Sequence, residues 1–257
     1  MTERTAANLA GRVALVTGGG AGMGQAHAIL MAERGADIVV QDVNRDTAEA
    51  TVTEIRGKGR KARAFVHDIA DIAATRAMVK AAEGEFGHID IVVNNAGIGG
   101  GRKKIEDIDE ALFHKMLNIH LTGHFFLTQA VVPGMKARRM GKIINIASRW
   151  AMTGADNSSH YIAAKGALVA ITKAWAHEFA PWNIHVNAVA PGGVWTDMVL
   201  KSAGEAFIRE EEKKVPLKRW AQPVEYAYAV AFLASGESDF ITGQVLSPNG
   251  GASIVGI

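Results

Sequence analysis

The stretch Val13-Ala-Leu-Val-Thr17, continuing into Gly18-Gly-Gly-Ala-Gly-Met-Gly24, decides the fold. Its first five residues form an apolar run of strand length, and the glycines precede a helical pattern through residues 25–34 that stops at Gly35. Glycine lets the backbone approach a phosphate closely, and the amides and dipole of a helix N-terminus bind the anion. The sequence therefore predicts a strand, a glycine turn and a helix that bind a dinucleotide.

The spacing of these glycines alone does not establish that the turn binds a dinucleotide. Gly18, Gly22 and Gly24 do not form Gly-x-Gly-x-x-Gly, and a flexible turn also explains a glycine cluster. The next apolar run, however, ends in Asp42, about 20 residues beyond the turn, where a carboxylate accepts hydrogen bonds from ribose hydroxyls. Its charge repels a 2′-phosphate, so we expect NAD rather than NADP. Arg45 would reach such a phosphate only by turning inward from the start of the next helix.

Polar residues end the next two predicted strands. Asp68 follows the alternating run of residues 61–67. We expect its side chain to contact the adenine, to cap a helix over residues 71–86, or to do both. Asn94-Asn95 ends the apolar run of residues 89–94 and precedes further glycines. Paired amides at a strand end pin neighbouring strands, and the glycines leave room for a cofactor. A plain turn is the alternative.

A long helix is expected over residues 109–136. Its middle is apolar on more than one face, which indicates burial or subunit contact. Asn118 is a polar residue in this setting and needs a partner. His120 and His124 are four residues apart, but the motif offers no third ligand, so we expect no metal site.

Tyr161-Ile-Ala-Ala-Lys165 carries the chemistry. Within a helix over residues 158–179, the two polar side chains lie about one turn apart on one face. A free tyrosine ionises near pH 10, and a nearby positive charge favours the phenolate. We therefore expect the ammonium of Lys165, together with a cationic cofactor ring, to bring the pKa of Tyr161 toward neutrality, which would make it a usable acid or base.

A tyrosine and a lysine one turn apart are an ordinary arrangement on a solvated helix. Ser148 favours a functional site instead. It follows a predicted buried strand over residues 142–147, so it would face the helix-borne tyrosine. A hydrolase built on Ser148, His160 and Asp156 is an alternative, but no Gly-x-Ser-x-Gly elbow surrounds the serine.

Composition excludes several classes. The 257 residues are 48% hydrophobic and 21% charged, enough for one full α/β domain. The net charge is +2 and no long basic run occurs, so nucleic-acid binding has no support. The chain has no cysteine, which excludes disulfides and cysteine-ligated zinc.

The ends of the chain carry fewer signals. Residues 1–11 are polar and contain Glu3, unlike a signal peptide, and no apolar run approaches the roughly 20 residues that cross a bilayer. We expect a cytoplasmic protein without membrane contact.

A strand over residues 184–190 precedes residues 198–216, which we expect to act as a mobile lid with one helix over 205–213. A helix over 223–234 and a last strand over 243–247 follow, all within a single domain of residues 1–257.

Taken together, the chain resembles the single-domain short-chain dehydrogenase/reductase family from Val13 to its C-terminus. The motifs of that family occur in order: Thr17-Gly-x-x-x-Gly-x-Gly24, Asn94-Asn-Ala-Gly97, Asn118, Ser148, Tyr161-x-x-x-Lys165, and Pro191-Gly192 leading to Thr196. The resemblance implies a Rossmann fold, a doubly wound parallel sheet of seven strands with helices on both faces. It also implies a homo-oligomer, with a tetramer favoured over a dimer, built partly through the helices that bear Asn118 and Tyr161.

The resemblance also implies roles. Tyr161 would exchange the proton, Ser148 would hold the substrate oxygen, Lys165 would lower the tyrosine pKa and bind the nicotinamide ribose, and Asn118 would support a water-mediated proton relay. Val194 and Thr196 would hold the nicotinamide carboxamide. The full set of expected NAD contacts is Gly18, Gly22, Met23, Gly24, Asp42, Asp68, Ile69, Asn95, Ala96, Gly97, Tyr161, Lys165, Pro191, Gly192, Val194 and Thr196.

Four residues are candidates for substrate contact. Arg149 either pairs with an acidic side chain or faces the pocket and selects an anion. Trp150, Met152 and Trp195 make the surroundings bulky and apolar, which favours a cyclic or aromatic alcohol or ketone.

The reaction expected is hydride transfer between NAD and a secondary alcohol or its ketone. An NADPH-dependent reductase of 3-oxoacyl carrier protein is the alternative within enzymes. A nucleotide-sensing scaffold is the alternative outside them, although it would not need Ser148, Tyr161 and Lys165 together.

Overall fold

The computed structural model describes residues 7–255, so Glu3 lies outside the described residues. The strands are β1 (Val13–Thr17), β2 (Asp37–Asp42), β3 (Ala62–Val66), β4 (Ile91–Asn94), β5 (Gly141–Ile146), β6 (Ile184–Val189) and β7 (Val245–Leu246). The α-helices are α1 (Gly22–Glu33), α2 (Arg45–Gly57), α3 (Ile72–Phe86), α4 (Glu110–Leu117), α5 (Gly123–Arg138), α6 (Trp150–Thr153), α7 (Ser159–Phe179), α8 (Asp197–Ala203), α9 (Glu205–Lys214) and α10 (Pro223–Ala234). Shorter turns are η1 (Ile105–Asp107), η2 (Asn118–Thr122), η3 (Ala180–Trp182) and η4 (Gly236–Ser238).

All seven strands pair in parallel in the order β3-β2-β1-β4-β5-β6-β7, which confirms the predicted doubly wound sheet. β1 lies between β2 and β4, so the direction of winding reverses there. In such sheets ligands bind beyond the carboxyl ends of the strands at this switch point.

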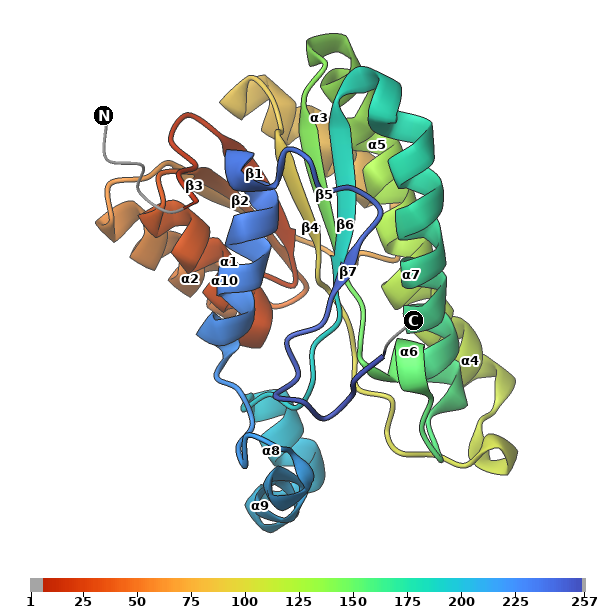
Figure 1. Cartoon of the computed structure of the whole chain (residues 1–257). Helices are drawn as coiled ribbons and strands as arrows, with labels where there is room; N and C mark the ends of the chain where they lie inside the picture. The colour runs from red at the N-terminus through yellow and green to blue at the C-terminus, as the bar shows by residue number, and fades with distance from the viewer. Residues whose placement is uncertain (1–6, 256–257) are drawn as a thin grey trace.

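Helices cover both faces of the sheet (Figure 1). One core packs α1, α2 and α10 against it through residues such as Met31, Val52 and Val230. The other packs α3, α5 and α7 through residues such as Val79, Leu127 and Trp175. Because both faces are buried, β1 and β4 consist almost entirely of buried apolar residues and show no alternation. No helix in residues 7–255 combines the length and apolarity that crossing a membrane requires.

Buried amides tie the central strands together. Asn94 Nδ2 donates to Asn145 Oδ1 (2.8 Å) on the next strand, and Asn145 Nδ2 donates to Thr172 Oγ1 (2.8 Å) on α7. Asn95 Nδ2 donates to the carbonyl of Thr17 (2.8 Å). The predicted pinning of strands by the Asn94-Asn95 pair is therefore confirmed.

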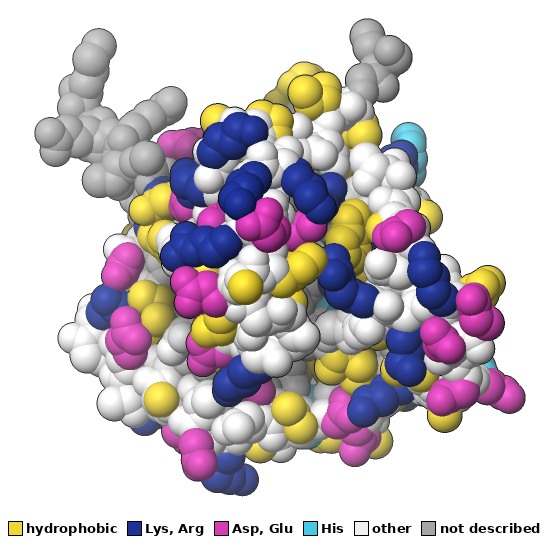
Figure 2. Space-filling model, turned by 90° about the horizontal axis from the view of Figure 1, so that it is seen from below, with side chains coloured by type: hydrophobic (Ala, Val, Ile, Leu, Met, Phe, Trp, Pro, Cys, Tyr) yellow, Lys and Arg dark blue, Asp and Glu magenta, His cyan; other side chains and the backbone are white. Residues whose placement is uncertain are grey.

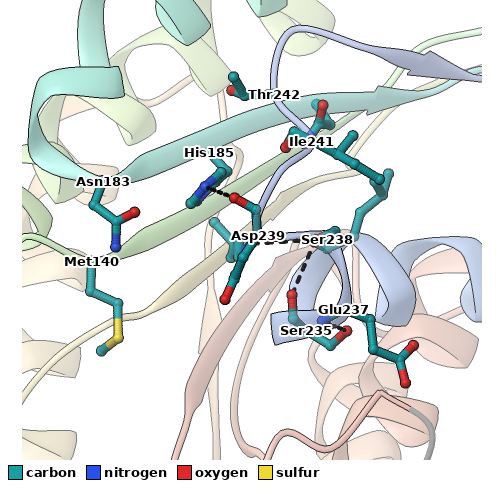
Figure 3. Close-up of polar contacts among 12 residues, drawn as sticks. Met140, Asn183, His185, Ser235, Glu237, Ser238, Asp239, Ile241 and Thr242 are labelled. Carbon is teal, nitrogen blue, oxygen red and sulfur yellow. Dashed lines mark hydrogen bonds and ion pairs between the residues drawn. The ribbon is translucent and has the colours of Figure 1, made fainter.

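Hydrogen bonds to β6 and within the segment itself hold the approach to β7 (Figure 3). His185 Nε2 donates to the carbonyl of Asp239 (2.9 Å), and Ser238 Oγ donates to the carbonyl of Ser235 (3.1 Å). The backbone amide of Val186 donates to Thr242 Oγ1 (3.1 Å). These bonds hold the segment between α10 and β7 against the edge of β6.

Three helix predictions are corrected. The helix expected over 109–136 is α4 and α5 joined by η2, a turn of π-helix in which the amide of Gly123 donates to the carbonyl of Asn118. The segment 198–216 holds two helices, α8 and α9, because Gly204 (φ +79°) separates them. The cap of α3 is Asp71, whose carboxylate accepts from the amide of Ala74, so the capping role predicted for Asp68 is wrong.

Candidate active site

The predicted site residues gather at the carboxyl ends of β1, β4, β5 and β6, below the sheet in Figure 1. Figure 2 looks onto this end, where hydrophobic side chains show between interspersed acidic and basic ones. The helices α8 and α9 stand over it (Figure 1).

The glycine turn has the geometry of a phosphate cradle. Gly18 (φ +63°) and Gly22 (φ +57°) adopt the left-handed conformation that favours glycine. A Cβ on Gly24 would lie 2.0 Å from the carbonyl oxygen of Gly18, so only glycine fits there. Ala21, the N-cap of α1, gives the first amides of the helix no side-chain acceptor, which leaves them for an anion. This part of the chain fits a dinucleotide pyrophosphate.

Asp42 lies beside this turn. Its Oδ2 accepts from the amide of Gly20 (2.8 Å) and its Oδ1 from the amide of Asn44 (2.9 Å). Each carboxylate oxygen retains a second lone pair for a ribose hydroxyl. Arg45 is exposed as the first residue of α2.

The segment after β4 is joined to β1 through Thr17. The amides of Asn95 and Ala96 both donate to Thr17 Oγ1 (2.9 Å each). A Cβ on Gly97 would lie 2.4 Å from Cε1 of His120, so the backbone packs directly on that ring. Ile69 is buried, whereas Asp68 is exposed and its Oδ1 accepts from the amide of Ala70.

Ser148, Tyr161 and Lys165 come together as predicted from the sequence. Backbone bonds from Ala147 to Val189 (2.8 Å) and from Arg149 to Pro191 (3.0 Å) hold the chain on both sides of Ser148. The Tyr161 hydroxyl is hydrogen bonded to the Ser148 hydroxyl. Lys165 Nζ lies 5.9 Å from the centre of the Tyr161 ring.

Burial dominates the ionisation of this pair. It raises the pKa of Tyr161 above 10, while the hydrogen bond to Ser148 acts in the opposite direction. In the chain without cofactor, burial therefore opposes the fall in the tyrosine pKa that we expect from Lys165 and a cationic cofactor ring together. Burial also lowers the pKa of Lys165 to about 7, although its Nζ donates to the carbonyl of Ile146 (2.6 Å).

Asn118 is exposed at the start of η2, so the expectation of a buried polar side chain is wrong for this residue. The buried side chain of this turn is His120, whose ring meets the Tyr161 ring edge-on, with centroids 5.5 Å apart. His124 is tied to Thr17 Oγ1 through Nε2 (3.2 Å) and to the carbonyl of His120 through Nδ1 (3.0 Å). The sequence showed this histidine pair but connected it only with metals.

The loop after β6 faces the glycine turn. A Cβ on Gly22 would lie 3.4 Å from Cγ2 of Thr196, and Val194 is buried in a bridge to Ala221. The amide of Gly192 donates to the carbonyl of Pro248 (3.3 Å). These contacts bring the predicted carboxamide residues next to the predicted phosphate turn.

Of the three apolar substrate candidates, Trp150 packs on Tyr161, whereas Met152 and Trp195 make their contacts elsewhere. The Trp150 ring meets the Tyr161 ring edge-on at 6.3 Å, whereas Met152 packs on the cluster of Ala147, Ala188 and Ala190. Trp195 turns to α9, where its Nε1 donates to Glu212 Oε1 (2.9 Å).

Glu212 is a residue that the sequence did not single out. It is 8% exposed, and the same Oε1 also accepts from the amide of Trp220 (3.0 Å). Arg209 donates to its Oε2 (3.2 Å). These bonds, the amide of Trp220 foremost, lower the Glu212 pKa and fix α9 to the loop that carries Trp195. A lone glutamate in a charged helix gave no sequence signal of this role.

Arg149 reaches the end of the chain. Its Nη1 donates to Ser253 Oγ (3.3 Å), and no carboxylate in residues 7–255 forms an ion pair with it, so the predicted acidic partner is wrong for this part of the chain.

The structure also contradicts a hydrolase triad of Ser148, His160 and Asp156. Asp156 is a surface residue near Lys104, and no hydrogen bond in the described range joins His160 to Ser148 or Asp156.

Comparisons with known proteins agree with this geometry. A family model described as enoyl-(acyl carrier protein) reductase matches residues 18–253. The chain is 38% identical to a 3-oxoacyl-acyl-carrier-protein reductase of Thermotoga maritima, over 96% of this chain and 99% of that one. It is 39% identical to trans-4-hydroxycyclohexanecarboxylate dehydrogenase of Sinomonas cyclohexanicum, over 97% and 95%.

Solved structures are similar over the same extent. Levodione reductase superposes with a TM-score of 0.92 at 34% identity, over 95% of this chain and 98% of that one. Xylitol dehydrogenase bound to NAD⁺ superposes with a TM-score of 0.89 at 33% identity, over 95% and 99%.

Proposed function

Because this chain belongs to the short-chain dehydrogenase/reductase family, and is thus an oxidoreductase of CH–OH or C=O groups, we propose that it transfers hydride between NAD and a secondary alcohol or its ketone. One observation carries the proposal. The Tyr161 hydroxyl is hydrogen bonded to Ser148, with Lys165 one helical turn away, at the same end of the sheet as a glycine turn that fits a dinucleotide.

Each end of the cofactor has a place in this arrangement. The glycine turn and the N-terminus of α1 would hold the pyrophosphate, and Asp42 would accept from the adenosine ribose. Val194 and Thr196 would hold the carboxamide, and Lys165 would bind the second ribose. Bound NAD would supply the hydride acceptor.

The protein's own groups handle the proton. Ser148 holds the substrate oxygen within reach of Tyr161, which takes the hydroxyl proton in oxidation and returns it in reduction. Since burial raises the Tyr161 pKa, the phenolate needs positive charge nearby, and Lys165 is the side chain placed to provide it.

The walls of the site support a ring-bearing substrate. Trp150 packs on Tyr161 from one side, and Met152 adds apolar surface nearby. A relative at 39% identity is named for a hydroxylated cyclohexane, which is consistent with this choice. Kinetics over a panel of cyclic, aromatic, steroidal, sugar and anionic alcohols would test it.

Residues 198–216 serve as the lid of this site in our proposal. They form α8 and α9, which stand over the carboxyl ends of the strands (Figure 1), and Glu212 fixes α9 to the loop that carries Trp195. Substrate exchange then requires these helices to move away from the cleft.

We also propose a homo-oligomer, with a tetramer favoured, built through the faces of α5 and α7. These helices enclose an apolar groove whose lining includes Phe125, Ala170 and Ile171. Phe125 is 38% exposed in the single chain, and a second copy would cover it.

The NADPH-dependent 3-oxoacyl-carrier-protein reductase is kept as a second candidate. A relative with that name shares 38% identity over nearly all of its length. Asp42 separates the two functions, because its carboxylate repels the 2′-phosphate of NADPH. Clear preference for NADPH in direct binding would favour the reductase.

Replacement of Tyr161 by phenylalanine tests the proposed reaction. The Tyr161→Phe variant should lose turnover by about 10²-fold or more, the size expected of an acid–base group, while NADH binding measured by fluorescence stays within about twofold. Substantial residual activity would remove Tyr161 from the mechanism.

A further inference from the structure

One carboxylate bonds to the loop that is expected to hold the carboxamide of the cofactor. Glu212 lies on α9 and is 8% exposed. Its Oε1 accepts two hydrogen bonds, one from Nε1 of Trp195 (2.9 Å) and one from the backbone amide of Trp220 (3.0 Å). Trp195 stands between Val194 and Thr196 in the sequence, so the first of these bonds ends within the carboxamide loop itself.

The two donors belong to segments that also pair with each other. The amide of Trp195 donates to the carbonyl of Ala221 (3.0 Å), and the amide of Ala221 donates to the carbonyl of Gly193 (3.1 Å). The ring of Trp220 packs on Gly193, where a Cβ would lie 2.3 Å from Cε2 of the indole. The segment before α10 therefore supports the carboxamide loop, and Glu212 bonds to one residue of each.

The acceptor is a charged group. The amide of Trp220 contributes most to lowering the pKa of Glu212, so the carboxylate is ionised at neutral pH. Arg209 Nη1 donates to its Oε2 (3.2 Å), and the Arg209 guanidinium lies over the Trp195 ring with Cζ 4.7 Å from a ring centroid. Hydrogen bonds to an ionised acceptor are stronger than those between neutral groups. The indole is thus held at its N–H by Glu212 and on its face by Arg209.

Order in this loop bears on how the cofactor binds. A loop that already has its binding conformation loses less conformational entropy when the ligand arrives. In the proposed function, Val194 and Thr196 hold the carboxamide, so this loop meets the nicotinamide end of the cofactor. Bonds that order the loop in the free protein should therefore strengthen binding of that end and leave binding of the adenosine end unchanged.

We propose that Glu212 is a positioning residue that holds the carboxamide loop in its binding conformation before the cofactor arrives. It acts through Trp195 and Trp220 rather than by contact with the cofactor. The inference rests on the proposed use of Val194 and Thr196 to bind NAD.

Two ligands separate this role from a general effect on folding. ADP-ribose contains the pyrophosphate and both riboses of NADH but lacks the nicotinamide ring and its carboxamide. Glu212→Ala leaves two N–H donors without their acceptor. We expect it to raise the NADH dissociation constant about tenfold and to change that of ADP-ribose by less than about twofold. Isothermal titration calorimetry on the full chain measures both.

Two further variants assign the effect to the hydrogen bonds. Glu212→Gln keeps an oxygen that can accept both bonds, so its NADH dissociation constant should stay within about threefold of the parent. Trp195→Phe removes one donor and keeps an aromatic ring for Arg209, so we expect a rise of about threefold to fivefold. It provides the same comparison of ligands if Glu212→Ala does not fold.

Steady-state kinetics give a second readout. At saturating NAD the bound cofactor itself orders the loop, so kcat in the Glu212 variants should stay within about twofold of the parent. KM for NAD should rise in parallel with the dissociation constant.

Glu211→Ala is the matched control, because it removes the preceding glutamate of α9, which pairs with Lys214 instead. It should leave both dissociation constants within about twofold, as expected of an exposed ion pair. Unchanged NADH binding in Glu212→Ala, equal losses for the two ligands, or a glutamine variant no better than alanine would overturn the inference. If the parent protein binds neither NADH nor ADP-ribose, the proposed function itself fails.

Discussion

The guanidinium of Arg102 lies over the ring of Phe207, with Cζ 3.9 Å from the ring centroid. Arg102 belongs to the segment after β4, which borders the proposed cofactor cleft, and Phe207 belongs to α9. This contact therefore joins the proposed lid to the opposite side of the site. No backbone hydrogen bond among residues 7–255 joins these two segments.

Removing the cation should loosen the lid. For Arg102→Met, which retains an unbranched stem, we expect KM for the alcohol to rise about twofold to fivefold, since a cation–π contact of this kind contributes about 0.5–1 kcal/mol. Steady-state kinetics and limited proteolysis of residues 198–216 are the measurements. Lys103→Met removes a neighbouring exposed cation as the control. Equal KM values in the three proteins would show that this contact does not hold the lid.

Asp42 should decide between the two dinucleotides. Asp42→Asn removes the negative charge but keeps an oxygen for a backbone amide, so the turn at Gly20 is retained. We expect the ratio of kcat/KM for NADP to that for NAD to rise at least about tenfold, which corresponds to about 1.4 kcal/mol. Asp46→Asn makes the same charge change in the first turn of α2. A ratio that moves equally in both variants would count against a specific role for Asp42.

Lys165 should make the stability of the cofactor-free protein depend on pH. Its pKa is about 7 in the folded chain and 10.5 ordinarily, so between these values the unfolded chain binds a proton that the folded chain does not. The free energy of unfolding therefore falls as the pH is lowered from about 10.5 to about 7, because the folded chain must bury the ammonium of Lys165. Below about pH 7 the contribution of Lys165 no longer changes.

Lys165→Met removes that penalty. We expect its melting temperature to exceed that of the parent by more at pH 7 than at pH 9.5, even though turnover is lost. Differential scanning calorimetry at the two pH values measures this, with the exposed Lys173→Met of the same helix as the control. A difference that is the same at both pH values would contradict a lowered pKa for Lys165.

The groove between α5 and α7 should govern assembly. Ala170→Glu places a carboxylate in an apolar lining, so we expect the oligomer to dissociate, as seen by sedimentation velocity. Ala50→Glu introduces the same charge on the exposed face of α2 and should leave the mass unchanged. An oligomer that persists in Ala170→Glu would place the interface elsewhere.

Much of the fold was predictable because its signals are local. The glycine turn, the run ending in Asp42 and the Tyr161-to-Lys165 spacing each depend on a few consecutive residues, and the structure brings them to one end of one sheet. Helix α8 was missed, because a helix of 7 residues is too short to show a clear apolar periodicity.

The remaining errors concern long-range contacts. Arg149 meets Ser253 from more than a hundred residues away, which no local pattern reveals. The pKa of Tyr161 depends on how deeply the finished fold buries it. The packing of His120 on Tyr161 was not predicted, because the periodicity of a regular helix does not describe the wider turn in which His120 lies.

That wider turn gives the chain an extra residue relative to an uninterrupted α-helix. Deleting one residue between Asn118 and Thr122 would rejoin α4 and α5 as one regular helix, and because the wider turn absorbs the extra residue, the two helices would keep nearly the same relative rotation while the side chains within the turn change direction. The imidazole would then swing off the tyrosine while every motif letter of the family stayed in place. Insertions and deletions in this short stretch are thus a route by which relatives could change which side chain packs on the ring of the tyrosine without altering Ser148, Tyr161 or Lys165.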